Sequence, residues 1–160
     1  MELRIGQGYD IHQLVPGRRL LLGGFAVPGQ TLGLLGHSDA DVLLHAIIDA
    51  LLGALALGDI GQHFSDQDTT WLNADSAMLL HTIRALPEVK DWQLVNLDST
   101  LIAQTPRLAP YIERIRENLA RLLVCPLDRI SVKAKTNEKL DAVGRGEAMV
   151  AQVVVLLEKL

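Results

Sequence analysis

Asp10 and His12 are separated by one residue, and His45 follows in a long apolar segment. Alternate side chains of a strand point to the same side, so the Asp10 carboxylate and the His12 imidazole can reach one point in space. With His45 as a third ligand, two histidines and one carboxylate would leave an open fourth position, as in catalytic zinc sites. In the alternative, which the residue types alone favour, Asp10 orients His12 in a turn and His45 is a hydrogen-bonded core histidine.

The segment around His45 carries a polar stripe. No proline occurs up to Leu57, and Asp41, His45 and Asp49 recur every four residues among Leu, Ile, Val and Ala. This spacing predicts a helix that is buried on most sides and has one narrow polar face. Because buried polar groups need partners, we expect Asp41 to cap the helix and support His45. Asp49 should meet a backbone donor or a partner side chain.

The ends of this helix are predicted from local signals. Ser38 or Asp39 is expected to be the N-cap, because Ser38 with Asp41 fits the S-x-x-D capping-box pattern. The helix is expected to stop at Gly58, since glycine commonly follows a last helical turn.

Two other polar segments could contact a ligand. The loop of residues 58–68 contains Asp59, Asp66 and Asp68, which could bind substrate hydroxyls or Mg²⁺, or be solvated, as we expect of Asp68. A cluster of donors beside one acid follows a predicted strand: Lys133, Lys135, Thr136, Asn137, Glu138 and Lys139. This cluster suits a phosphate with a metal-binding carboxylate, and a charged hairpin is about as consistent with its composition.

The composition describes one folded domain, residues 1–160. The chain is 49% hydrophobic and 21% charged, with a formal net charge of -4, which argues against general affinity for nucleic acid or an anionic membrane. Cys125 is the only cysteine, so no disulfide can form within one chain. The N-terminal residues have no signal-peptide pattern. The most apolar run is shorter than the roughly 20 residues of a membrane span. We therefore expect a cytoplasmic protein.

The elements that must position these residues are predicted in the order ββααβαββ. Strands are expected at residues 3–9, 19–27, 92–104, 130–134 and 148–157, and a loop at 30–36. The two glycines of the first strand indicate that another segment approaches it closely. We predict an α+β fold: a mixed four-to-five-stranded sheet with helices on one face. The run at 153–157 is apolar at every position, so it should be buried on both faces, with another subunit on the second.

The chain resembles the 2-C-methyl-D-erythritol 2,4-cyclodiphosphate synthase family over essentially its whole length. The resemblance rests first on three segments: GYDIH at 8–12, HSDADVLLHA at 37–46 and DALLGA at 49–54. It continues in the same order through GDIG at 58–61, IAQ at 102–104, EKL at 138–140 and GRGE at 144–147. The resemblance implies a lyase of the non-mevalonate isoprenoid pathway. Such an enzyme converts 4-diphosphocytidyl-2-C-methyl-D-erythritol 2-phosphate to the cyclic diphosphate and releases CMP.

The resemblance also implies roles for individual residues. Asp10, His12 and His45 would hold Zn²⁺, and Glu138 would bind a second divalent ion, Mg²⁺ or Mn²⁺. Residues near the phosphates would be His37, Ser38 and Thr136. The methylerythritol pocket would contain Asp59, Gly61 and Asp66, and the cytidine pocket Ala103, Arg107, Leu108 and Lys135. The family is homotrimeric, with its active sites between subunits, which implies a trimer packed around the second sheet face. Arg145 would lie near the mouth of a central cavity that takes an isoprenoid diphosphate.

Several residues depart from the usual family pattern: Ser65, Lys135, Asn137, Asp141 and Ala142. These departures do not change the expected zinc ligands. They affect the expected cytidine contacts and the expected ligand of the central cavity. Two other functions are compatible with the same residues. One is a metal-dependent phosphohydrolase that uses water as the nucleophile, and the other is a non-catalytic trimer stabilised by zinc.

Overall fold

The computed structural model describes all residues, 1–160, and contains one five-stranded sheet. The strands are β1 (Leu3–Pro16), β4 (Leu32–Leu34), β5 (Trp92–Ile102), β6 (Ile130–Lys135) and β7 (Ala148–Lys159). Their order across the sheet is β4-β1-β7-β5-β6; β5 and β6 are parallel, and every other neighbouring pair is antiparallel. The predicted mixed sheet is confirmed.

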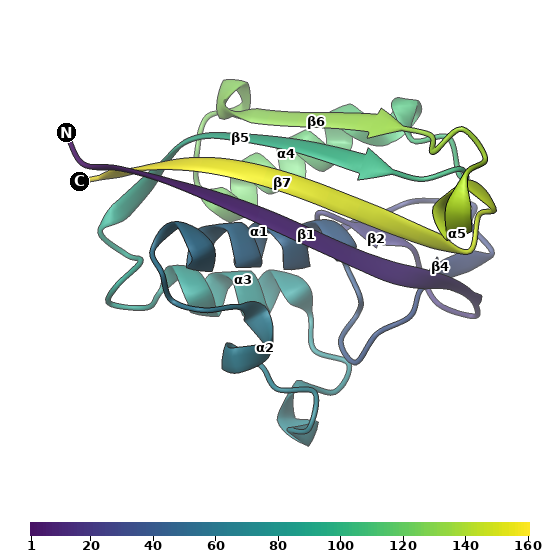
Figure 1. The fold of residues 1–160 in the computed structure, drawn as a ribbon, viewed down its shortest axis with the longest axis horizontal. Coiled ribbons are helices and arrows are strands. Elements are labelled where there is room, and N and C mark those ends of the chain that lie inside the picture. The colour runs from purple at the N-terminus through teal and green to yellow at the C-terminus, as the bar shows by residue number, and fades with distance from the viewer.

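The three long helices cover one face of this sheet (Figure 1). They are α1 (Val42–Ala54), α3 (Ser76–Arg84) and α4 (Ile112–Leu123). Helix α1 packs on β1 and β7, α4 packs on β6, and α3 packs against α1. Shorter helical turns are α2 (Ile60–His63), α5 (Asp141–Gly144) and the 3₁₀ turns Thr69–Trp71, Ala109–Tyr111 and Leu127–Arg129. No helix is both long enough and apolar enough to cross a bilayer.

Strand β1 is longer than the sequence suggested. It does not end at Asp10 but pairs with β7 from Leu3 to Gln13 and with β4 from Leu14 to Pro16. Asp10 and His12 therefore lie within a strand, where both side chains point toward α1. The N- and C-terminal ends of the chain lie side by side, because Leu3 is paired with Glu158 (Figure 1).

The segment between β1 and α1 also differs from the prediction. The strand expected at 19–27 is a small hairpin of β2 (Leu21–Leu22) and β3 (Phe25–Ala26), and the loop expected at 30–36 contains β4. The hairpin has positive φ angles at Gly23 and Gly24, which allow its tight turn. Its backbone supplies donors to the start of α1.

Asp41 is the N-cap of α1, so its predicted capping is confirmed. Neither Ser38 nor Asp39 is the N-cap, and the expected capping box is absent. The Asp41 carboxylate is fully buried and accepts backbone N–H bonds from four residues: Gly23, Gly24, Leu43 and Leu44. It thus joins the hairpin to the helix. The helix ends at Ala54, earlier than the predicted stop at Gly58.

We expect Asp41→Asn to destabilise the protein by about 1–3 kcal/mol, because the new amide N–H₂ must face a buried backbone donor. Urea unfolding followed by circular dichroism measures the change. Asp75→Asn is the matched control, since exposed Asp75 caps α3 with one bond to Ala77 and Asn caps a helix equally well. Equal losses in the two variants would contradict the role assigned to Asp41.

The second face of the sheet is open. Along β7, Val153, Val155 and Leu157 are buried against the helices, whereas Val154 is 44% exposed. The prediction that this run is buried on both faces is therefore wrong for the single chain. The open face also carries Ile5, Tyr9 and Ile11 on the neighbouring β1, all exposed. The cover by another subunit stays a prediction.

Candidate metal centre

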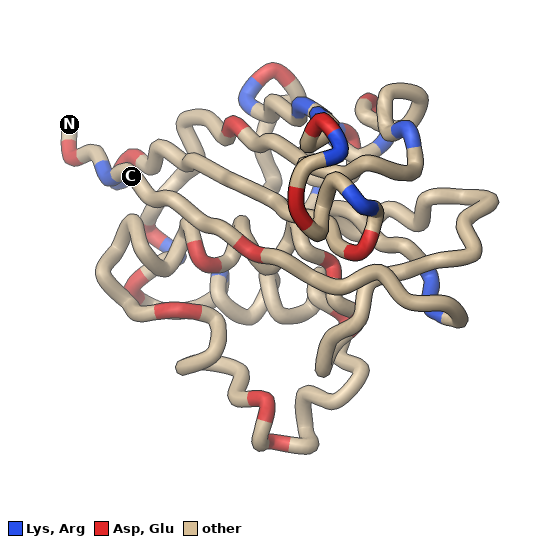
Figure 2. Tube along the Cα trace, turned by 45° about the vertical axis from the view of Figure 1, so that its right-hand side comes forward, with Lys and Arg blue, Asp and Glu red and all other residues tan.

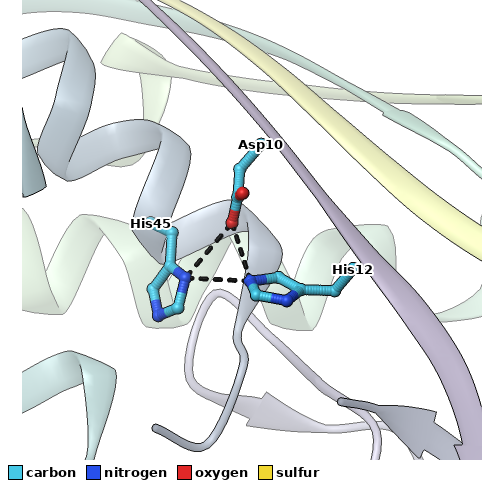
Figure 3. A group of neighbouring side chains, drawn as sticks. All are labelled: Asp10, His12 and His45. Atoms are coloured by element: carbon cyan, nitrogen blue, oxygen red, sulfur yellow. Dashed lines mark hydrogen bonds and ion pairs between the residues drawn. The ribbon is translucent and has the colours of Figure 1, made fainter. Parts of the chain in front are cut away.

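Asp10 and His12 on β1 and His45 on α1 converge on one point (Figure 3). The Asp10 Oδ2 atom lies 2.9 Å from His12 Nε2 and 3.1 Å from His45 Nδ1, and the two ring nitrogens are 3.1 Å apart. The sequence predicted this group, and the structure brings its three ligand atoms together from segments more than thirty residues apart.

The hydrogen bonds around His12 show that a cation must lie between the three side chains. His12 Nδ1 lies 2.8 Å from the Leu35 carbonyl, which can only accept, so Nδ1 carries a proton. The remaining nitrogen, Nε2, faces the Asp10 carboxylate and a second imidazole. Atoms with lone pairs facing one another at this distance need a cation between them, either a proton or a metal ion.

The same contacts shift the acidities of the group. Burial alone would raise the pKa of Asp10, but the hydrogen bonds and charges of His12 and His45 outweigh it and lower this pKa to about 2. Burial would lower the pKa of His12, but its contact with Asp10 raises it overall. The site is therefore built to hold positive charge beside an ionised carboxylate.

A cavity of about 230 Å³ opens beside the three ligands. Its polar lining residues include His37, Ser38 and Asp66, and its apolar lining residues are Ile60, Phe64, Trp71 and Leu79. None of the lining residues is Lys or Arg. Figure 2 shows the loop that follows α2 at the bottom of the view, and the acidic segments of this loop have no basic segment beside them. Three predicted site residues thus line one cavity together with the three candidate metal ligands.

Two predicted pocket residues do not line this cavity. Asp59 is exposed and caps α2, where its carboxylate accepts from the backbone and side chain of Gln62, each at 3.0 Å. Gly61 is exposed within α2. Asp68 caps a 3₁₀ turn, which agrees with the expectation of a solvated loop residue.

The remaining predicted site residues lie at or after the ends of β5 and β6 in the chain: Ala103, Arg107, Leu108, Lys135, Thr136, Glu138 and Arg145. Ala103 and Leu108 are buried, and the Ala103 N–H donates to the Lys135 carbonyl at 2.9 Å. The Thr136 hydroxyl donates to Glu138, and Arg145 forms an ion pair with Glu147 at 2.7 Å. None of these residues lines the cavity beside His45.

The two carboxylates of the polar stripe, Asp41 and Asp49, have different functions from His45. Asp49 accepts from the Ile60 N–H at 2.8 Å and so holds α2 near the cavity, as expected of a residue that meets a backbone donor. Asp41 caps the helix but does not contact the His45 ring. The prediction that Asp41 supports His45 is therefore wrong.

The hydroxyls of Ser38 and Ser76 lie 3.0 and 2.9 Å from His45 Nε2, the ring nitrogen that does not face Asp10. Ser76 was not identified from the sequence. Its only local signal is its position directly after the capping Asp75, which gives no information about a contact with a residue thirty-one positions earlier.

The fold and the triad define a class: an α+β protein with a candidate metal centre where a sheet meets its covering helix. Within this class, the chain belongs to the YgbB family, whose model matches residues 3–158. A relative from Burkholderia ambifaria, named 2-C-methyl-D-erythritol 2,4-cyclodiphosphate synthase, is 58% identical over 99% of this chain and 98% of its own length. A relative of the same name from Burkholderia thailandensis is 59% identical over 98% of this chain and 96% of its own.

Solved structures show the same fold. A Plasmodium falciparum IspF in complex with CDP has a TM-score of 0.84 and 36% identity, covering 98% of this chain and 96% of its own. The bifunctional IspDF from Campylobacter jejuni has a TM-score of 0.93 and 39% identity over 99% of this chain. The present chain spans 43% of that bifunctional protein.

Proposed function

We propose that this chain is a 2-C-methyl-D-erythritol 2,4-cyclodiphosphate synthase of isoprenoid biosynthesis. It takes 4-diphosphocytidyl-2-C-methyl-D-erythritol 2-phosphate and forms the cyclic diphosphate. An oxygen of the 2-phosphate bonds to the β-phosphorus, the bond from that phosphorus to the α-phosphate oxygen breaks, and CMP leaves. The observation that carries the proposal is the convergence of Asp10, His12 and His45 beside a cavity in a chain 58% identical to synthases of this name.

Asp10, His12 and His45 fit a zinc ion. Two imidazole nitrogens and one carboxylate oxygen, with the cavity at an open fourth position, match the donor set of catalytic zinc sites. A bound divalent ion would supply Lewis acidity and a template for phosphate oxygens. In support of a metal, the cavity has no Lys or Arg to neutralise a phosphate, and Asp66 adds negative charge.

The residues of this chain contribute mainly by positioning. The attacking oxygen belongs to a phosphate that is ionised at neutral pH, so the reaction needs no general base. His37, Ser38 and Asp66 line the cavity. We place the phosphates beside His37 and Ser38 and the methylerythritol hydroxyls beside Asp66. Holding the nucleophile in line with the β-phosphorus can contribute roughly 7–11 kcal/mol to lowering the barrier.

The second group of site residues would recognise the nucleotide. Glu138 is proposed to bind a second divalent ion, Mg²⁺ or Mn²⁺, with Thr136 beside the diphosphate. Ala103, Arg107, Leu108 and Lys135 would enclose the cytidine, and Asp59 and Gly61 would complete the methylerythritol pocket. In support, Thr136 and Glu138 are hydrogen-bonded and exposed next to the end of β6.

These two groups are far apart within one chain. One row across the sheet runs from Ile11 through Val150 and Ile102 to Lys135, which is three strand spacings, or roughly 14 Å. A diphosphate that contacts both the triad and Glu138 is shorter than this distance, so it would bind between copies of the chain. We propose a homotrimer packed through the open apolar face of β1 and β7, with its active sites between subunits.

The central cavity of such a trimer is the proposed site for an isoprenoid diphosphate. A hollow of about 230 Å³ on the open face is lined by Tyr9 and Ile11 and by the departing residues Asn137, Asp141 and Ala142. Arg145 would have to exchange Glu147 for a phosphate to bind there. The cytoplasmic location stays a prediction.

The product identifies the reaction. Incubating the protein with the substrate and divalent ions should give CMP and a cyclic diphosphate in equal amounts, measured by ³¹P NMR. A linear phosphate product would instead indicate the phosphohydrolase. Tightly bound zinc without any turnover would indicate the zinc-stabilised trimer.

A further inference from the structure

We propose that Ser76 and Asp39 are positioning residues that fix the tautomer of His45 and so keep its Nδ1 lone pair directed at the metal site. The inference rests on the proposed metal-binding function of Asp10, His12 and His45. It concerns residues that lie behind the imidazole, away from the cavity.

The contacts form a chain of hydrogen bonds from the ring to a carboxylate. His45 Nε2 lies 2.9 Å from the Ser76 hydroxyl, and this hydroxyl donates to Asp39 Oδ1. The Asp39 carboxylate also accepts backbone N–H bonds from Ser76 at 3.0 Å and from Asp41 at 3.1 Å. Ser76 is fully buried and Asp39 is half-buried, so the Ser76 hydroxyl between His45 and Asp39 is shielded from water.

The direction of these bonds follows from the carboxylate. An ionised carboxylate can only accept, so the single hydroxyl proton of Ser76 is directed to Asp39. The Ser76 oxygen then has only lone pairs left for His45. A stable contact at 2.9 Å therefore requires a proton on His45 Nε2, which leaves the lone pair on Nδ1, the atom that faces Asp10 and His12.

Ser38 could favour the opposite tautomer. Its hydroxyl lies 3.0 Å from His45 Nε2 and accepts the Ala40 N–H at 3.1 Å, and its own proton has no carboxylate partner among its hydrogen bonds. If this proton were donated to Nε2, His45 would carry its proton on Nδ1 and could not bind a metal there. The Asp39–Ser76 pair removes this ambiguity. The two serines thus provide a matched comparison at nearly equal distance.

The arrangement also joins the metal ligand to two other elements. Ser76 is the first residue of α3, and Asp39 lies in the segment that leads into α1. The Asp39 N–H donates to the Ala74 carbonyl at 3.0 Å, just before α3. The start of α3 is therefore held against the start of α1 at the point where His45 needs support.

The test compares Ser76→Ala with Ser38→Ala by zinc affinity, using competition with a chromophoric chelator and no substrate. Removing such a supporting hydrogen bond typically weakens metal binding about 10–100-fold, which we expect for Ser76→Ala. Ser38→Ala should keep an affinity close to that of the unchanged protein. Ser76→Thr, which retains the hydroxyl, should restore most of the affinity.

A ¹⁵N NMR measurement on the zinc-loaded protein gives a second readout. We expect a slowly exchanging proton on His45 Nε2 in the unchanged protein and in Ser38→Ala, and a fast-exchanging one in Ser76→Ala. Unchanged affinity and slow exchange in Ser76→Ala would overturn the inference while leaving the synthase function intact. If Ser76→Ala does not fold, a folded Ser76→Thr with weak zinc binding, or a fast-exchanging Nε2 proton in the unchanged protein, would overturn it. Failure of the unchanged protein to bind zinc would overturn both proposals.

Discussion

Replacing His45 with alanine should lower the rate of CMP release by at least about 10³-fold, because losing a bound Lewis acid costs several kcal/mol of transition-state stabilisation. His45 supplies one of only three protein ligands, and its loss leaves Asp10 and His12 as a pair. Bound zinc, measured by mass spectrometry after dialysis, should fall to near zero. The ring is part of a cavity wall, so the fold should survive.

His81→Ala is the matched control, since His81 is exposed on α3 and does not line the cavity. It should retain zinc and activity. A His45→Ala protein that loses zinc yet releases CMP at the normal rate would show that the triad is not used in the reaction.

Gly8→Ala should destabilise the protein by about 3 kcal/mol or more, at the upper end of overpacking effects. A Cβ at this position would lie 1.9 Å from the Ala46 carbonyl oxygen of α1, so the helix must move away from the sheet. Ala46 directly follows His45 on α1, and Gly8 lies two residues before Asp10 on the same face of β1. Movement of α1 away from β1 should therefore also separate His45 from Asp10 and His12. Thermal unfolding with and without zinc measures both effects.

Gly53→Ala is the control for a glycine on the same helix–strand contact. Its nearest neighbour to a new Cβ is the Gln7 carbonyl at 3.9 Å, which is ordinary contact. Alanine there should raise stability by up to about 1 kcal/mol through helix propensity. Similar unfolding midpoints for the Gly8→Ala and Gly53→Ala proteins would contradict the close approach of β1 and α1.

Much of the site could be predicted because its signals are local. The one-residue gap between Asp10 and His12 places both on one side of a strand, and the four-residue repeat of α1 gives His45 a defined face. The glycines at 6 and 8 correctly indicated a close neighbour, since a Cβ at Gly6 would lie 1.8 Å from the Ala50 carbonyl oxygen. Fold class followed from the order of the elements.

The missed features depend on tertiary contacts. Strand β1 extends past Asp10 because β4 and β7 offer pairing partners, and neither partner is visible in the local sequence. Capping by Asp41 was expected, but the two further donors that a distant hairpin adds to its carboxylate were not. Ser76 supports His45 from another helix, and serine at a helix start is common for purely local reasons.

The adjacent chain ends have a consequence for modular construction. Leu3 pairs with Glu158, whereas Asp10 pairs with Ala151, so the metal ligands lie about seven residues, or roughly 23 Å, along the sheet from both ends. A domain joined to either end would be held away from the cavity, and the bifunctional protein from Campylobacter jejuni shows that this fold occurs within a longer chain. The same geometry makes this domain a good candidate for circular permutation, in which a short linker joins the neighbouring ends of β1 and β7 and new ends open in an exposed loop.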